Sequence, residues 1–120
     1  MDANLDAALI SLLAVSGRRI AVIAESQSAA NMLGDEVSVA GQANIRRWVK
    51  ASGQEEIQFK SGGFVFLMSR RGPNRVRGRR FDLIVIDDHR YLQDEEFMMG
   101  IVPCFSDASG GRPRIGVLVI

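Results

Sequence analysis

The sequence predicts an α/β domain of three layers, in which a mainly parallel sheet with an added β-hairpin lies between helices. Two observations carry this prediction. Helical and strand-like stretches alternate along the chain, which is typical of parallel sheets. Residues 20–24 and 83–86 are unbroken apolar runs, as expected for strands buried on both faces. The chain has 120 residues, 47% of them hydrophobic, so we expect one core and a single domain over residues 1–120.

The first predicted helix covers residues 3–15, and Asp2 can cap its N-terminus. Almost every side of this helix is apolar, so we expect it to pack against the sheet and to be largely covered. Ser16 and Gly17 end it, and the strand at residues 20–24 follows.

A second helical region is expected to open at Ser26 or Ser28 and to reach about residue 51. Two glycines interrupt it, which predicts a break or kink within residues 34–42. Near its end, apolar residues fall at helical spacing and are expected to pack in the core; these are Ile45, Trp48 and Val49.

A β-hairpin follows. Residues 57–59 and 64–68 alternate between apolar and other positions, and Ser61-Gly62-Gly63 supplies a short turn between them. The next twelve residues, 69–80, contain six arginines separated by Gly, Pro and Asn. This composition predicts an exposed loop.

The next strand, residues 81–86, brings Asp87 and Asp88 to its C-terminal end. A helix over about residues 93–106 and a last apolar strand at 115–120 complete the pattern. Because open α/β sheets bind ligands outside the C-terminal ends of their strands, the two aspartates are candidate site residues. Paired carboxylates there suit Mg²⁺. In the alternative interpretation, Asp87 caps the following turn and Asp88 is solvated.

Composition excludes several classes of protein. A single cysteine, Cys104, rules out an intramolecular disulfide framework and favours a reducing compartment. One histidine and the absence of zinc-ligand spacing argue against a zinc site. No apolar stretch is long enough to cross a bilayer, and no basic region precedes the first one, so we expect a cytoplasmic protein without a membrane partner.

Short motifs occur in a recognisable order along most of the chain. The strand at 19–24 leads to a helix that starts near Ser26 and then to the hairpin at 56–66. Arg77-Gly78 precedes the acidic strand at 81–87, and Ile101-Val102-Pro103 follows a short helix. This ordered set resembles the ATPase domain of the large terminase subunit of tailed bacteriophages, the motor that packages DNA into capsids. The resemblance implies a partial P-loop NTPase-like core and, for a phage-encoded protein, the host cytoplasm.

The resemblance also assigns roles. Asp87 matches the Walker B aspartate that binds Mg²⁺, and Asp88 stands where the family has the glutamate that orients the attacking water. Arg77 corresponds to an arginine that many terminases insert into a neighbouring subunit's nucleotide site as a finger.

The departures from the family decide the expected activity. The chain lacks the phosphate-binding G-x-x-x-x-G-K-[ST] motif, and neither Lys50 nor Lys60 lies in such a context. Asp88 is one methylene shorter than glutamate, and small displacements of this kind are costly in catalysis. The chain also ends before the segment that couples hydrolysis to DNA movement. We therefore expect a truncated relative that does not hydrolyse ATP by itself and has no cofactor of its own.

Two surfaces of the chain are candidates for binding. In this ATPase class the P-loop strand lies beside the strand that corresponds to residues 115–120, so the chain's last strand is expected to be an open edge that pairs with another protein or with a second copy in a homo-oligomer. Its interface residues are Ile115, Val117, Leu118, Val119 and Ile120.

The arginine-rich segment could contact DNA phosphates. Its candidate residues are Arg70, Arg71, Arg75, Arg77, Arg79 and Arg80. No aromatic residue lies among them, which argues against base stacking. The alternative is a solvated loop partly balanced by Asp82, Glu95 and Glu96.

Three interpretations of the whole chain stay open at this point. It is a non-catalytic binding domain, or one half of a split ATPase whose P-loop comes from another chain, or a piece of a longer terminase. In the split ATPase, Asp87 would hold Mg²⁺ and ATP would be bound between the two chains.

Overall fold

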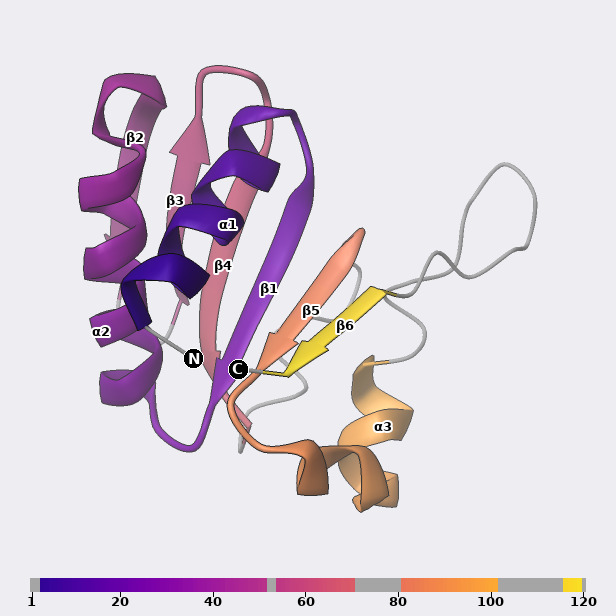
Figure 1. Ribbon diagram of the computed structural model, residues 1–120. Coiled ribbons are helices and arrows are strands. Elements are labelled where there is room, and N and C mark those ends of the chain that lie inside the picture. The colour runs from indigo at the N-terminus through magenta and orange to yellow at the C-terminus, as the bar shows by residue number, and fades with distance from the viewer. Residues whose placement is uncertain (1–2, 52–53, 71–80, 102–115, 120) are drawn as a thin grey trace.

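A six-stranded sheet forms the middle layer of the fold in the computed structural model, which describes residues 3–51, 54–70, 81–101 and 116–119 (Figure 1). The four parallel strands are β4 (Phe64–Ser69), β1 (Arg19–Ala24), β5 (Leu83–Ile86) and β6 (Gly116–Val119). Two antiparallel strands, β2 (Ile45–Ala51) and β3 (Gln54–Phe59), extend the sheet beyond β4. The sheet order is β2-β3-β4-β1-β5-β6. This confirms the predicted α/β class, with a mainly parallel sheet and a hairpin.

Helices cover the two faces of the sheet. On one face lie α1 (Ala3–Val15) and α2 (Gln27–Ala40), whose small and branched residues pack on β1, β3 and β4. On the other face, a 3₁₀ turn, η3 (His89–Gln93), and the short helix α3 (Glu95–Ile101) bring Tyr91 and Phe97 against Ile23, Phe66 and Ile86. Because β1 is buried on both faces, its continuous apolar sequence is the pattern that a central parallel strand requires.

The predicted second helix is wrong beyond residue 40. Ser26 caps α2 by accepting a hydrogen bond from the Ala29 N–H, and the helix ends at Gly41. A 3₁₀ turn, η1 (Gln42–Asn44), leads into β2. The residues assigned to the end of a helix, Ile45, Trp48 and Val49, therefore lie in a strand.

The expected break within residues 34–42 is confirmed at its second glycine, Gly41, where α2 ends, but it does not occur at Gly34. Gly34 lies within α2 and is buried, because the helix backbone approaches the Leu67 side chain of β4 there. Glycine is needed at this position for its small size and not to break the helix.

The last predicted helix begins two residues later than expected, at Glu95 instead of Gln93. Residues 89–93 form η3, and Asp94 accepts a hydrogen bond from the Phe97 N–H at the start of α3. The remainder of that prediction, residues 102–106, lies outside the described residues. No helix in the described part of the chain is long and apolar enough to span a bilayer.

Candidate functional site at the carboxyl ends of the strands

Polar side chains follow three neighbouring strands at the edge where the strands end. Glu25 comes directly after β1, Arg70 directly after β4, and Asp87 directly after β5. Because these strands are parallel, the three residues lie at the same edge of the sheet, with Tyr91 of η3 beside them.

Glu25 is the centre of this cluster. Arg70 Nε donates to Glu25 Oε2 at 2.7 Å, and the adjacent Arg70 nitrogen donates to Oε1 at 3.3 Å. The Tyr91 hydroxyl donates to Glu25 Oε2 at 3.2 Å. The Arg70 guanidinium also lies 5.4 Å from the centre of the Tyr91 ring. These contacts join the ends of β1 and β4 to η3.

Asp87 is exposed at the end of β5, and its carboxylate accepts a hydrogen bond from the Glu25 N–H at 3.3 Å. Its charge also acts on Tyr91. Burial of the phenol raises the pKa of Tyr91 well above its ordinary value, and the nearby Asp87 and Glu25 carboxylates raise it further. Tyr91 is therefore a neutral hydrogen-bond donor in this cluster.

Asp88 has a structural role in the described residues. It caps η3 by accepting a hydrogen bond from the Arg90 N–H at 2.9 Å, and its carboxylate forms an ion pair with the Arg90 guanidinium. The sequence analysis offered Asp87 as the cap of this turn and Asp88 as a solvated residue. The structure exchanges these roles, because Asp88 caps the turn and Asp87 is exposed.

A polar pocket of about 390 Å³ lies at these strand ends, and two ion pairs line it, Arg70–Glu25 and Arg90–Asp88. Its lining residues are Glu25, Arg70, Asp88, Arg90, Tyr91 and Asp94. Each of its two guanidinium groups faces a carboxylate, so the pocket holds ion pairs that tie the strand ends together.

The nucleotide chemistry that the family resemblance implies does not fit the residues present. Asp87 offers one exposed carboxylate to Mg²⁺, but Asp88 is paired with Arg90 and the sequence has no phosphate-binding loop. No group of three or more His, Cys, Asp or Glu side chains in the described part of the chain could hold a metal ion.

A second polar cluster lies at the opposite ends of the same strands, where β1 and β5 begin. Arg19 binds Asp82 through two guanidinium nitrogens, at 3.1 and 3.2 Å, and through its backbone N–H at 3.0 Å. Burial alone would raise the pKa of Asp82, but the hydrogen bonds from Arg19 outweigh it and lower that pKa. Asp82 thus neutralises Arg19, whereas the sequence had suggested that it balances the arginine-rich segment. The pair fixes the start of β1 against the start of β5.

The structure brings together part of the predicted site. Asp87, Asp88 and Arg70 lie at one edge, and Val117, Leu118 and Val119 belong to β6 at the end of the sheet. Glu95 and Glu96 lie exposed on α3. The remaining predicted residues lie outside the described ones; these are Arg71, Arg75, Arg77, Arg79, Arg80, Ile115 and Ile120.

Sequence reasoning missed Glu25, Arg90, Tyr91 and Asp94. The rule that selected Asp87, a charged residue directly after a buried strand, also selects Glu25 after residues 20–24. Tyr91 carries no such signal, because only the path of η3 brings it to Glu25.

The sheet order and the helix layers define a three-layer α/β fold with a mainly parallel sheet. Among solved structures, the chain is similar to the large terminase ATPase domain of Thermus phage P74-26, with a TM-score of 0.57 and 13% sequence identity. The match covers 95% of this chain and 54% of that one, so the chain spans about half the length of its structural neighbour. No family model and no curated protein matches the sequence. The likeness shows a shared fold.

Proposed function

We propose that this chain is a non-catalytic, terminase-related binding domain that accepts a strand of another protein chain along β6. The observation that carries the proposal is the position of β6 at the end of the sheet. It pairs with β5 through residues 83–86 and 116–119, and no other described strand pairs with it. An edge strand presents unpaired N–H and C=O groups to a second strand.

The two edges of the sheet differ in their chemistry. The β2 edge carries exposed Arg46, Arg47 and Lys50, and its register shifts between Ile45 and Arg47. Charges and bulges of this kind protect an edge strand against pairing. The β6 sequence, Gly-Val-Leu-Val, has no charge and no proline. This contrast supports pairing at β6 and not at β2.

Two features support a non-catalytic role. The position at which the terminase family has its water-orienting glutamate is Asp88, whose carboxylate pairs with Arg90 and caps η3. The chain also lacks a phosphate-binding loop. A strand that pairs with β6 would not by itself supply a phosphate-binding loop. It would also leave Asp88 paired with Arg90.

A split ATPase is the second candidate function, and the exposure of Asp87 favours it. A partner that places a P-loop strand beside β6 would bring its phosphate-binding loop to the edge where Asp87 lies. ATP turnover that appears only when the two chains are mixed would establish this candidate.

A pair of proline variants tests pairing at β6. Neighbouring residues of a parallel strand direct their N–H groups to opposite sides, so one of Val117→Pro and Leu118→Pro removes an N–H from the open edge and the other removes one from the β5 ladder. The mass of the chain in solution is measured by light scattering over a wide concentration range, and folding is measured by thermal unfolding.

We expect the wild-type chain to self-associate. The proline variant that loses only an N–H of the open edge should keep the wild-type melting temperature and should be monomeric. A wild-type chain that stays monomeric at all concentrations and binds no added P-loop chain contradicts the proposal. The same titration with a DNA duplex tests the arginine-rich segment. A mass increase with DNA that depends on salt would support that separate prediction.

A further inference from the structure

The outer surface of the α1/α2 layer is unusually apolar for a surface in contact with water. Leu12 of α1 is 66% exposed, and Met32 and Val39 of α2 are 68% and 76% exposed. Helix α1 has almost no polar face, and helices of that kind are normally covered on all sides. Only one side of α1, with Ala7, Ile10 and Ala14, is covered by the rest of the described chain.

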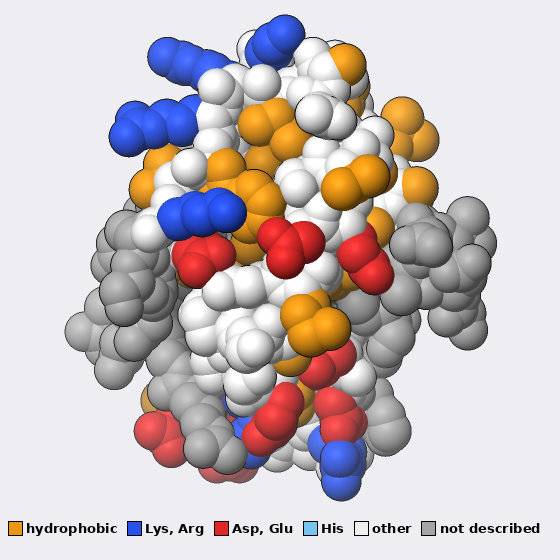
Figure 2. Space-filling view, turned by 90° about the vertical axis from the view of Figure 1, so that its left-hand side faces the viewer, with side chains coloured by type: hydrophobic (Ala, Val, Ile, Leu, Met, Phe, Trp, Pro, Cys, Tyr) orange, Lys and Arg blue, Asp and Glu red, His pale blue; other side chains and the backbone are white. Residues whose placement is uncertain are grey.

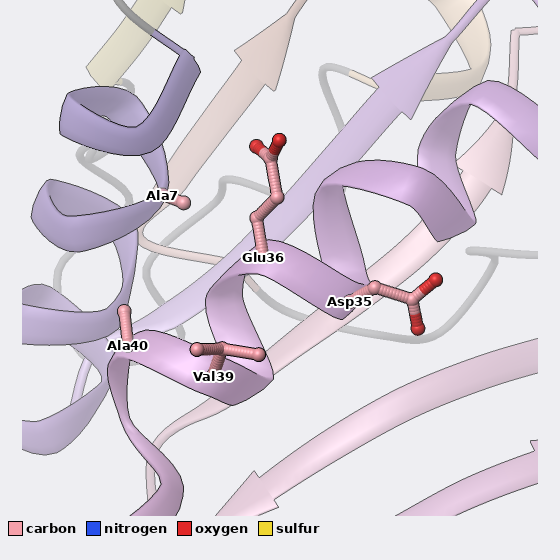
Figure 3. A pocket seen from close by; sticks show the side chains of 5 residues that line it. All are labelled: Ala7, Asp35, Glu36, Val39 and Ala40. Atoms are coloured by element: carbon pink, nitrogen blue, oxygen red, sulfur yellow. The ribbon is translucent and has the colours of Figure 1, made fainter.

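Two pockets lie along α2 on this surface. One has a volume of about 280 Å³ and is lined by Ala29, Met32 and Leu33 of α2 together with β1 and β5 side chains and Asp87, which follows β5. The other has a volume of about 400 Å³ and lies between α1 and α2, where Ala7 and Val39 line it (Figure 3). Glu36 lines both pockets, so its carboxylate stands between two mainly apolar hollows.

The charges on this layer are all of one sign. Residues 3–15 and 27–40 contain no lysine or arginine. The side chains of Asp35 and Glu36 have no hydrogen bond or ion pair with the described residues. Figure 2, which views the molecule from the α2 side, shows exposed hydrophobic side chains next to a row of acidic ones, with Lys and Arg side chains beside one end of that row. The surface is therefore apolar with unpaired negative charge.

We propose that this surface binds an amphipathic helix of a partner protein, with apolar side chains in the two pockets and a lysine or arginine between them at Glu36. Charge complementarity selects this occupant. A second copy of the chain would bring Asp35 and Glu36 against their own kind, and an anionic membrane would be repelled by both. The proposal concerns a different surface from β6 and does not depend on pairing there.

The positions of the pockets predict the spacing of the partner's residues. The pockets are lined by α2 residues around 29–33 and around 36–40, which are separated by about seven residues or about 10 Å along the helix axis. A partner helix lying along α2 would thus carry apolar anchors at i and i+7. Its basic residue would lie at i+3 or i+4.

The probe is a fluorescent synthetic helix of about 16 residues with leucines at i and i+7 and lysines at i+3 and i+4, and its binding to the full chain is followed by anisotropy. A matched probe carries glutamate in place of lysine. The chain variants are Met32→Lys and Glu36→Lys, and the control is Met99→Lys, because Met99 is 77% exposed on α3.

We expect the lysine probe to bind, and Met32→Lys and Glu36→Lys each to weaken it about tenfold or more. The glutamate probe should not bind, and Met99→Lys should change the affinity less than about twofold. Failure of the lysine probe to bind the folded chain would overturn the proposal. So would equal binding of both probes, or binding that Met32→Lys leaves unchanged.

Two further results identify another occupant and count against the proposal. A solution mass that falls with Met32→Lys would show that a second copy covers the surface. Co-sedimentation of the wild-type chain, but not Met32→Lys, with vesicles containing phosphatidylserine would show a membrane. Because the Val117→Pro and Leu118→Pro pair reports on β6 separately, failure here is distinguishable from failure of the proposed function.

Discussion

Arg70 Nε lies 2.7 Å from Glu25 Oε2, and this ion pair joins the carboxyl ends of β4 and β1. Tyr91 completes the arrangement, since its hydroxyl donates to the same carboxylate oxygen. These contacts tie together the strand ends at which related folds bind ligands. A charged group that serves in such contacts is less available for catalysis.

The titration of Tyr91 provides a direct measure of this cluster. It is the only tyrosine in the chain, so ultraviolet absorbance of the phenolate reports on it alone. We expect no ionisation in the folded protein near the ordinary pKa of about 10. Asp87→Asn and Glu25→Gln should each lower the pKa of Tyr91, because each removes a carboxylate that favours the neutral phenol. Asp35→Asn is the control, because Asp35 is not among the groups that raise the pKa of Tyr91.

The raised pKa of Tyr91 also makes stability depend on pH. Above about pH 10 the unfolded chain loses the phenol proton while the folded chain keeps it, so the free energy of unfolding falls as pH rises. Below that pH the contribution is fully present. Urea unfolding between pH 8 and about pH 11 should show this fall in the wild type and a smaller one in Tyr91→Phe. Identical slopes would refute the assigned environment.

The Arg19–Asp82 pair should stabilise the fold at neutral pH. Asp82→Ala removes hydrogen bonds to a backbone N–H and to a guanidinium that is 43% exposed, so after allowance for solvent screening we expect a loss of about 1 kcal/mol. Because the pKa of Asp82 is lowered in the folded state, this contribution is present above about pH 4 and is lost as pH falls below it. Asp35→Ala removes a carboxylate that has no partner among the described residues, and it should change stability by less than about 0.5 kcal/mol. Equal losses in the two variants would show that the pair is unimportant.

Gly63 and Gly34 test the packing of the hairpin and of α2. A Cβ at Gly63 would overlap the backbone carbonyl oxygens of Ala14 and Arg18, which cannot move independently. A Cβ at Gly34 would meet only the end of the Leu67 side chain, and alanine gains helix propensity there. We expect Gly63→Ala to cost about 3 kcal/mol and Gly34→Ala about 1 kcal/mol in denaturant unfolding. The opposite ranking would mean that the hairpin does not pack on the end of α1 as described.

The central strands were predictable from sequence because burial on both faces requires continuous apolar runs, as in β1 and β5. Strand β2 was not, and its bulge gives the reason. Ile45 pairs with Phe59 and Trp48 with Ile57, so the extra residue between Ile45 and Arg47 places side chains three apart on the same face of the sheet. A spacing of three residues on one face is also the signature of a helix.

The candidate site was predictable only in part for a related reason. Asp87 and Asp88 could be placed at the end of a strand from local pattern. Their partners could not, because Glu25 and Arg70 are 45 residues apart and meet only through the pairing of β1 with β4. The role of Asp88 depends on two local contacts with Arg90, the cap to its N–H and the ion pair with its guanidinium, and local pattern did not show which of the two aspartates would make them.

Amide hydrogen exchange of residues 116–119 tests pairing at β6 most directly. In a dilute monomer, the amides that face β5 should be protected and the intervening ones should exchange nearly as fast as in an unstructured peptide. On raising the concentration, or on adding a partner chain, the fast amides should become protected together. Protection of all β6 amides in the monomer would show that the chain covers its own edge, and this would contradict the proposed function.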